Sequence, residues 1–325
     1  MIVLRKRMDR ILQFIFCSVF ALLSACTTVG DKEYTLEDAI NKNIAIPIPI
    51  RVTEKGLIVL EGVKIDGRAV DMIIDTGATQ SAIFKSSLNR LGTNALSYGE
   101  TMVHGMMQSK QHDIVTLEKL EIGPLRFLNK PMVVLGSRDW SLGNTADYDG
   151  LIGMDILASY KLYISSKSGE LRLIPNSADV LIPYQWDRVD LIENPFLEDN
   201  RSLHFIELRV DGRKTPALLD TGSEFNAMNW NSASYTQAKH LRKRLRKEWV
   251  LQGASGTFDP VAKANLKQVR SGQKFWDDKD FIIMDFKSLD ILGAEDDPFI
   301  IVGMNLLAEE TVVLDFENNI MAIKP

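Results

Sequence analysis

Cysteine is nearly absent from this chain of 325 residues. Its two cysteines, Cys17 and Cys26, both lie close to the N-terminus. The sequence after them therefore has no thiol pair for a disulfide and no thiolate ligands for a metal. Long apolar runs are also missing after residue 25, so no later segment is apolar enough to span a membrane as a helix.

An excess of basic charge is missing as well. The net charge is −5 at pH 7, and removal of residues 1–25, which carry +3, lowers it to about −8. Such a chain is a poor partner for nucleic acid. With 45% hydrophobic and 25% charged residues, the composition is that of a globular protein, and the length is enough for two domains.

The first 25 residues have the pattern of a signal peptide. Four basic residues precede the apolar stretch 11–23, which is short for a transmembrane helix. The stretch ends in Leu23-Ser24-Ala25-Cys26, which resembles the bacterial lipobox, whose cysteine is diacylated and becomes the mature N-terminus. This resemblance implies a lipid anchor at Cys26 on the periplasmic side of a Gram-negative envelope. Thr27 after the cysteine favours the outer membrane. The alternative is an ordinary secretory signal with an incidental cysteine.

The rest of the chain repeats itself once. Two motifs recur, with the same spacing, at an offset of 145 residues: Asp66-Gly67-Arg68 with Asp75-Thr76-Gly77, and Asp211-Gly212-Arg213 with Asp220-Thr221-Gly222. Alternating apolar segments precede both copies and predict strands, and the Asp-Gly pairs predict hairpin turns. Each acid then stands at the end of a second, apolar strand.

Further landmarks follow each acid in the same order. About thirty residues on, each half has a glycine-containing segment that predicts a hairpin tip, 103–109 and 251–257. An apolar-apolar-Gly element comes next, Leu151-Ile152-Gly153 and Ile301-Val302-Gly303. A strand-turn-strand segment closes each half, at Pro175 and at Pro325.

The repeat predicts an all-β fold of two similar lobes with few short helices. We expect a signal peptide at 1–25, a tether at 26–45, an N-terminal lobe at 46–178 and a C-terminal lobe at 179–325, whose first part, 179–202, links the lobes. The tether contains a segment, 34–43, that is compatible with a short helix. Residues 234–249 have apolar side chains at helical spacing among six basic ones, which predicts a helix with a solvated basic face or, alternatively, a contact with anionic lipid headgroups.

A doubled acid loop has a chemical use. If the lobes pack about a pseudo-twofold axis, Asp75 and Asp220 meet across it, and two adjacent carboxyl groups share one proton. The ionised group then serves as a general base toward water, while the protonated group donates to a peptide carbonyl. This chemistry requires no metal, no cofactor and no nucleophilic side chain. Gly77 and Gly222 let the backbone point N–H groups at the acids.

Both halves resemble the bacterial retropepsin-like aspartyl proteases, and the fused arrangement is similar to that of pepsin-type enzymes. The resemblance covers residues 46–325. It implies two β-barrel lobes and an aspartic endopeptidase that cleaves extended peptide or protein substrates. Its implied catalytic residues are Asp75 and Asp220, and its implied loop-supporting residues are Thr76, Gly77, Ala78, Thr221, Gly222 and Ser223. Its implied flap residues are Val103, His104, Gly105, Met106, Gln252, Gly253 and Ala254.

Some features depart from the family or leave alternatives open. Ala78 stands where pepsins have a hydroxyl, and the first hairpin tip has no tyrosine, so an optimum between mildly acidic and near-neutral pH is expected. His104 and His112 flank that tip, and we interpret them as hydrogen-bonded or surface residues rather than metal ligands. Asp155 and Asn305 are interpreted as local hydrogen-bonding positions. We expect a monomer with intramolecular lobe pairing; pairing between chains, and an inactive peptide-binding scaffold, are the alternatives.

Overall fold

The computed structural model describes most of the chain after residue 32. The described residues are 33–92, 96–104, 109–136, 148–196, 202–238, 242–244, 251–253, 256–258, 262–286, 289 and 292–325; for 242–244, 251–253 and 256–258 only the backbone is described. No helix in this part of the chain is long and apolar enough to cross a membrane.

The first half of the chain forms an eight-stranded sheet that closes on itself. Its strands run in the order β3 (Ile50–Val52), β4 (Ile58–Ile65), β5 (Arg68–Ile74), β10 (Gly150–Ile152), β6 (Ala82–Phe84), β9 (Leu125–Leu135), β8 (Ser109–Ile122) and β7 (Leu96–His104). An additional pairing between β4 and β8 closes the sheet into a barrel. Helices α3 (Lys85–Leu91) and α4 (Met154–Leu157) complete this half.

The second half repeats the central part of that arrangement. Its strands run in the order β18 (Arg242–Arg244), β21 (Ala262–Leu266), β24 (Lys279–Ile283), β17 (Asn226–Met228), β25 (Ile300–Val302), β16 (Arg213–Leu219) and β15 (His204–Val210). Also in this half are β22 (Val269–Ser271), β23 (Lys274–Trp276), the separate hairpin β19 (Leu251–Gly253) and β20 (Gly256–Phe258), α5 (Trp230–Tyr235) and α6 (Met304–Leu307).

Two features of the repeat create the acid loops. All four residues of Asp66-Gly67 and Asp211-Gly212 have positive φ, as a two-residue type I′ hairpin turn requires. These turns connect β4 to β5 and β15 to β16. Each second strand then runs parallel to an apolar-apolar-Gly strand: β5 beside β10, and β16 beside β25. The hairpins predicted from the sequence are therefore present, and each acid directly follows a strand held on both sides.

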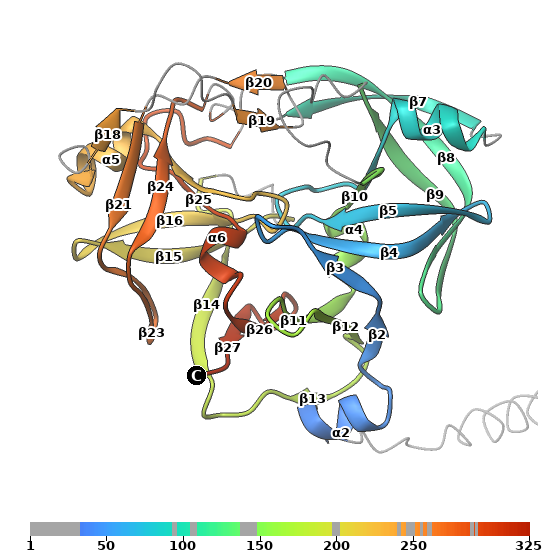
Figure 1. The fold of residues 1–325 in the computed structure, drawn as a ribbon, viewed down its shortest axis with the longest axis horizontal. Coiled ribbons are helices and arrows are strands. Elements are labelled where there is room, and N and C mark those ends of the chain that lie inside the picture. Colours follow the sequence, from blue (N-terminus) through green and yellow to red (C-terminus); the bar gives the residue numbers. More distant parts are fainter. Residues whose placement is uncertain are drawn as a thin grey trace, which may run out of the picture.

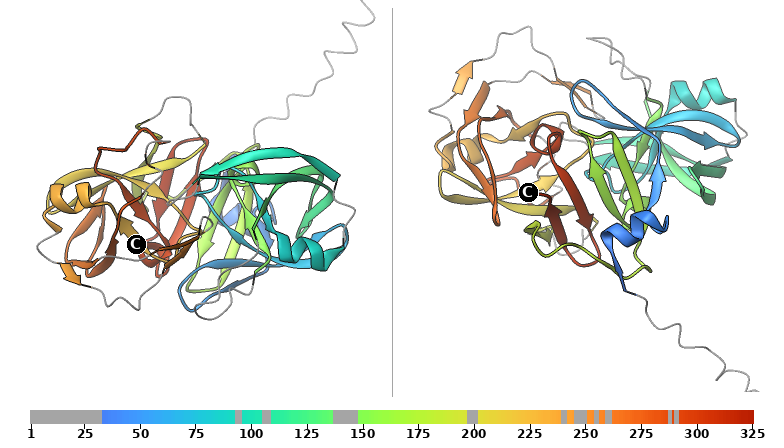
Figure 2. Two further views of the ribbon diagram at one scale, coloured as in Figure 1. Left: turned by 90° about the horizontal axis from the view of Figure 1, so that it is seen from above. Right: turned by 60° about the horizontal axis from the view of Figure 1, so that its bottom comes forward.

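A six-stranded antiparallel sheet joins the halves beneath the acid loops (Figures 1 and 2). Its order is β2 (Ile46–Ile48), β12 (Glu170–Pro175), β11 (Tyr160–Ser165), β26 (Thr311–Asp315), β27 (Ile320–Ile323) and β14 (Asp187–Glu193). At its centre β11 pairs with β26, and Tyr163 lies opposite Val313, its own counterpart in the repeat. The pseudo-twofold axis therefore passes through this pair, and one continuous hydrophobic cluster extends through both halves.

Part of the predicted tether is folded. Residues 34–45 form β1 (Tyr34–Thr35) and α2 (Leu36–Asn41), and β1 pairs with β13 (Val180–Leu181). Thr35 caps the helix, and Leu36 and Ala39 are buried against the six-stranded sheet together with Trp186. The short helix compatible with this sequence exists, so residues 34–45 of the predicted tether belong to the fold.

The predicted basic helix over 234–249 is wrong. α5 ends at Tyr235, and Gln237 has a φ of 60°, which interrupts a right-handed helix. Arg242–Arg244 instead form β18, which pairs with β21 at the edge of the sheet. Basic side chains are common on edge strands, where they discourage further pairing. The helical spacing of the apolar residues was outweighed by the backbone hydrogen bonds that the sheet edge offers.

A buried ion pair crosses the junction of the halves, and its loss should destabilise the protein. Lys161 Nζ lies 3.0 Å from Asp315 Oδ2, and both side chains are at most 5% exposed. Lys161→Met leaves the carboxylate buried without its cation, so we expect a loss of about 3–5 kcal/mol in the free energy of unfolding, measured in urea.

The matched control is Lys214→Met, because Lys214 pairs with Glu207 at a distance of 2.8 Å but both side chains are about half exposed. This change should cost less than about 1 kcal/mol. Equal losses in the two variants would contradict the role assigned to the buried pair.

Candidate active site

The acid loops of the two halves lie directly against each other. A Cβ atom added to Gly77 would be 2.6 Å from Cγ of Asp220, and one added to Gly222 would collide in the same way with Asp75. Only glycine permits the backbone of each loop to come this close to the opposite carboxylate. The structure therefore brings together the two acids that the repeat singled out.

Reciprocal hydrogen bonds lock the loops together. The backbone N–H of Thr76 donates to Oγ1 of Thr221, and the N–H of Thr221 donates to Oγ1 of Thr76, both at 3.1 Å. Each hydroxyl also donates to a carbonyl oxygen of the opposite strand: Thr76 to Leu219 at 2.7 Å, and Thr221 to Ile74 at 3.0 Å. Both threonines are fully buried, so these four bonds connect the halves where water cannot replace them.

Backbone N–H groups hold each carboxylate in place. Gly77 N–H donates to Oδ1 of Asp75, and Gly222 N–H donates to Oδ1 of Asp220, both at 2.9 Å. The backbone N–H groups of the acids donate to the adjacent strands, Asp75 to the carbonyl of Ile152 and Asp220 to that of Val302, again at 2.9 Å. The apolar-apolar-Gly elements thus fix the positions of the acids.

The two carboxyl groups are half-buried and share a hydrogen bond, and both have raised pKa values. Burial raises the pKa of Asp75 to about 6, although hydrogen bonds from Asp220 and from the N–H groups of Gly77 and Ala78 oppose the increase. Burial also raises the pKa of Asp220 well above its ordinary value, and the negative charge of Asp75 adds to this effect. Between the two titrations the pair therefore shares one proton, and one of the two carboxyl groups is ionised.

A polar brace supports the first loop from behind. Ser81 donates its backbone N–H and its hydroxyl to Oδ1 of Asp155, at 2.8 and 2.7 Å. The N–H of Gly153 donates to the Ser81 hydroxyl at 3.0 Å. Lys130 forms an ion pair of 2.7 Å with the other oxygen of Asp155. Asp155 therefore has the local hydrogen-bonding role expected from the sequence.

The second loop has the same brace built from amides. Asn226 Nδ2 donates to Oδ1 of Asn305 at 3.0 Å, and the N–H of Gly303 donates to Oδ1 of Asn226 at 3.1 Å. Sequence reasoning found Asn305 but missed Ser81 and Asn226. The signal was available, because these two polar residues stand 145 positions apart, six after each acid.

The remaining predicted loop residues play backbone roles. The carbonyl of Ala78 accepts from Met154 N–H at 2.9 Å, and that of Ser223 accepts from Met304 N–H at 2.8 Å. The Ser223 hydroxyl donates to the carbonyl of Phe225 at 2.8 Å. This serine hydroxyl therefore stabilises its own loop.

The predicted flap segments are hairpins in both halves. Val103 and His104 end β7, which pairs with β8, and Val103 packs against the core while His104 is exposed. Gln252 and Gly253 belong to β19, which pairs with β20. Both hairpins lie on the side of the molecule opposite the six-stranded sheet (Figure 1). Gly105, Met106 and Ala254 lie outside the described residues, as does the predicted lipidation site Cys26.

The two histidines near the first hairpin make separate contacts. Nδ1 of His104 lies 2.8 Å from the hydroxyl of Ser109, and Nδ1 of His112 lies 3.0 Å from the carbonyl oxygen of Val134. Their interpretation as hydrogen-bonded residues agrees with these contacts.

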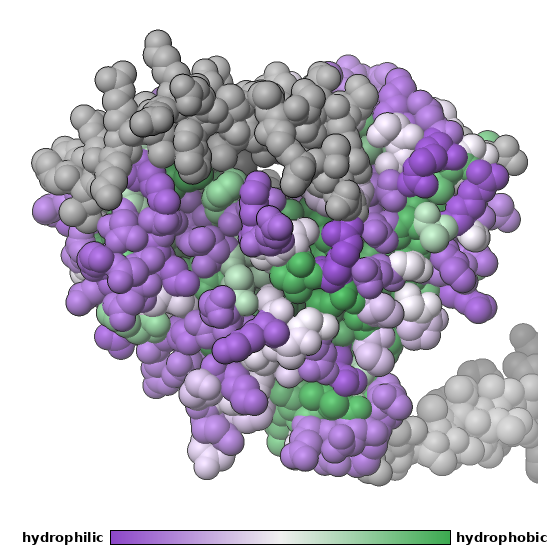
Figure 3. Space-filling model, viewed as in Figure 1, coloured by the Kyte–Doolittle hydropathy of each residue, from purple (hydrophilic) through white to green (hydrophobic). Residues whose placement is uncertain are grey.

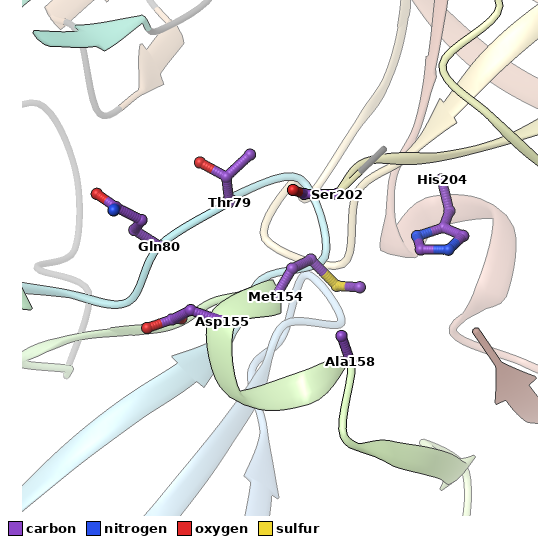
Figure 4. A pocket seen from close by; sticks show the side chains of 7 residues that line it. All are labelled: Thr79, Gln80, Met154, Asp155, Ala158, Ser202 and His204. Atoms are coloured by element: carbon purple, nitrogen blue, oxygen red, sulfur yellow. The ribbon is translucent and has the colours of Figure 1, made fainter. Parts of the chain in front are cut away.

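A cavity of about 390 Å³ lies beside the first acid loop without containing either acid (Figure 4). Its lining comes from the loop, from α4 and from the start of β15: Thr79, Gln80, Met154, Asp155, Ala158, Ser202 and His204. The corresponding place in the second half is covered by Lys55, which pairs with Glu224 at 2.9 Å and lies over the ring of Phe225. The cavity is thus a packing difference between the halves, away from the carboxyl groups.

Removing one threonine hydroxyl should destabilise the lock measurably. Thr76→Val keeps the shape of the side chain but leaves the Thr221 N–H and the Leu219 carbonyl without their partner. We expect a loss of about 2–4 kcal/mol in the free energy of unfolding, because each unsatisfied buried group costs about 1–3 kcal/mol. Thr76→Ser is the control, since it keeps the hydroxyl and should retain most of the stability in urea unfolding. Equal losses for valine and serine would show that the methyl group, not the hydrogen bonds, supports the loops.

Comparison with known proteins identifies part of this arrangement. Residues 62–156 match the family model of aspartyl proteases. No curated protein matches the chain. The matched range contains Asp75, its loop and the brace up to Asp155 and Ile156. Asp220 lies outside it, and is linked to Asp75 by the sequence repeat and by the geometry of the two loops.

Proposed function

We propose that this protein is an aspartic endopeptidase in which Asp75 and Asp220 together activate a water molecule. The observation that carries the proposal is the pairing of two half-buried carboxyl groups across a pseudo-twofold axis, held by reciprocal threonine hydrogen bonds. A structural role alone would not favour two adjacent acids, because burying them side by side is unfavourable. The aspartyl protease match over residues 62–156 supports the same reaction.

One shared proton gives the two acids different roles, described here with Asp75 ionised and Asp220 protonated. Ionised Asp75 removes a proton from water, and the resulting hydroxide attacks the carbonyl carbon of the peptide bond. At the same time the proton held by Asp220 passes to the carbonyl oxygen, which gives a neutral tetrahedral intermediate. When the carbon–nitrogen bond breaks, the proton taken up by Asp75 passes to the leaving amine and a hydroxyl proton of the intermediate returns to Asp220. The pair ends with one proton, as it began.

The surroundings of the pair suit an extended polypeptide. The hairpins β7–β8 and β19–β20 lie on the side of the molecule opposite the six-stranded sheet (Figure 1). We propose that the hairpins close over the substrate and exclude water from the reaction. Because the first half supplies one acid and the second half supplies the other, a single chain completes the site.

We further propose that the protein is a lipoprotein attached through Cys26 to the periplasmic face of the outer membrane. The non-acidic Thr27 after the cysteine favours the outer membrane, as the lipoprotein resemblance implies. The support for this location is the sequence Leu23-Ser24-Ala25-Cys26 and the apolar stretch before it. Mass spectrometry of the mature N-terminus tests it, since a diacylated Cys26 is expected and an unmodified chain would contradict it.

Substitution of either acid should abolish hydrolysis. Asp75→Asn and Asp220→Asn are nearly isosteric, but each removes a group through which the other acts. We expect cleavage of a mixed peptide library by residues 27–325 to fall at least about 10³-fold in each variant, with the double variant hardly worse than either single one. Lys214→Met, which removes an exposed ion pair with Glu207, is the control and should keep most activity.

Three outcomes would change the proposal. Full activity in either single asparagine variant would disprove a catalytic site formed by both acids. Activity restored by mixing the two single variants would show that the halves pair between chains. Peptide binding by the wild-type protein without cleavage of any sequence from pH 3 to 8 would favour the inactive scaffold.

The activity should depend on pH in a bell-shaped manner with its acid limb near pH 6. Below that value Asp75 is protonated and cannot accept a proton from water, because burial raises its pKa to about 6. The alkaline limb lies well above, where Asp220 loses its proton. The measurement is kcat/KM against pH, and a maximum near pH 3 would contradict these assignments.

The same shifts give a check that does not require catalysis. Carboxyl groups with a raised pKa in the folded state bind protons more tightly there than in the unfolded chain. The stabilisation they provide is complete below their unfolded pKa of about 4 and is lost as pH rises through the folded values. Thermal melts of the wild type should therefore lose stability between pH 4 and 8 relative to the double asparagine variant, which lacks both groups.

A further inference from the structure

The base of the molecule, opposite the hairpins, carries exposed apolar side chains. We define the base as α2, β13 and the loop 182–184. Tyr184 is 90% exposed and Leu181 is 48% exposed, while Ile40, Ile44 and Ile182 lie partly buried beside them. Figure 3 shows a hydrophobic patch over β13 and the neighbouring α2, with hydrophilic residues along the outermost edge of this end. A tyrosine this exposed next to aliphatic residues suits the boundary between water and lipid, where aromatic rings with a polar tip are enriched.

The base contains no basic side chain: its charged residues are the acidic Glu37 and Asp38. Lys42 forms an ion pair of 2.8 Å with Asp38 and also lies over the ring of Tyr34. Arg188, next to the loop, donates to the carbonyl oxygen of Ile182 at 3.3 Å. An uncompensated basic patch would favour anionic headgroups specifically. Without such a patch, a contact through apolar side chains is favoured, which depends less on the charge of the lipid.

The chain emerges from this same base. Tyr34 pairs with Val180, and its N–H donates to the carbonyl of Asp179 at 2.8 Å, so the beginning of the fold is fixed there. Only eight residue steps separate Tyr34 from Cys26, which allow a span of at most about 30 Å. A compact body of about 290 residues has a radius of gyration of about 19 Å and is roughly 50 Å across. A tether of this length, attached at the base, is too short for the opposite side to turn toward the bilayer.

We propose that the base rests on the membrane surface, with Tyr184 and Leu181 at the level of the lipid headgroups and the carboxyl pair facing away from the bilayer. This inference rests on the lipid anchor of the proposed function. It specifies the substrate class further: polypeptide segments that reach the site from the aqueous side, rather than segments lying close to the membrane that holds the protein.

A fluorescent label at two tyrosines tests this orientation. Tyr184 lies in the base, and Tyr98, which is 71% exposed, lies on β7 at the opposite side of the molecule. Each is replaced separately, as Tyr184→Cys and Tyr98→Cys, in the full lipidated protein; the only other cysteine after processing, Cys26, is blocked by its acyl chains. The labelled proteins are reconstituted in phosphatidylcholine vesicles containing nitroxide-labelled lipid, and acylation is verified by mass spectrometry.

The expected result is strong quenching of the label at position 184 and no loss of fluorescence at position 98. Equal quenching at both positions, or stronger quenching at 98, would overturn the proposal. An unmodified Cys26 removes the anchor and overturns it as well. Quenching requires no catalysis, so the Asp75→Asn background gives the same answer and separates this proposal from the proposed peptidase activity.

Discussion

The contact between two acid loops is the constraint around which this fold is built. Two carboxyl groups lie side by side and half-buried, which raises the pKa values of both and disfavours the doubly ionised pair. Such an arrangement persists only if the surrounding structure holds it in place. Glycines allow the approach, buried threonines tie the loops to each other, and a strand on each side fixes the backbone of each acid.

The two halves keep the same geometry with different chemistry. The first brace joins a serine hydroxyl to a carboxylate that also binds Lys130, and the second joins two amides. In each half the brace supplies a side-chain oxygen that accepts a hydrogen bond from the N–H of the glycine after the apolar pair. In both halves a side-chain donor meets an Oδ1 acceptor, so different residues hold the two loops in the same way.

Much of the site could be predicted because its signals are local and repeated. The Asp-Gly turns, the apolar strands ending in an acid, and the glycines after each acid are short-range patterns, and their recurrence places the two acids in equivalent positions. The six-stranded sheet was not predicted, since pairing between β11 and β26 joins residues about 150 positions apart and has no local signature. The packing of α2 under that sheet depends on the same distant strands. Helical spacing around residue 241 was misleading because a sheet edge offered the basic segment a partner.

The shared sheet also limits how the molecule can move. In a protein whose lobes meet only through side chains, the lobes can swing apart about a hinge to admit a ligand. Here β11 of the first half pairs with β26 of the second half through backbone hydrogen bonds. The hydrogen bonds of the buried threonines also join the two halves. Swinging the halves apart would require breaking backbone hydrogen bonds and exposing a hydrophobic cluster that extends through both. The paired strands and the threonine hydrogen bonds therefore form a continuous floor beneath the acid loops, which resists any change in the separation of the two acids.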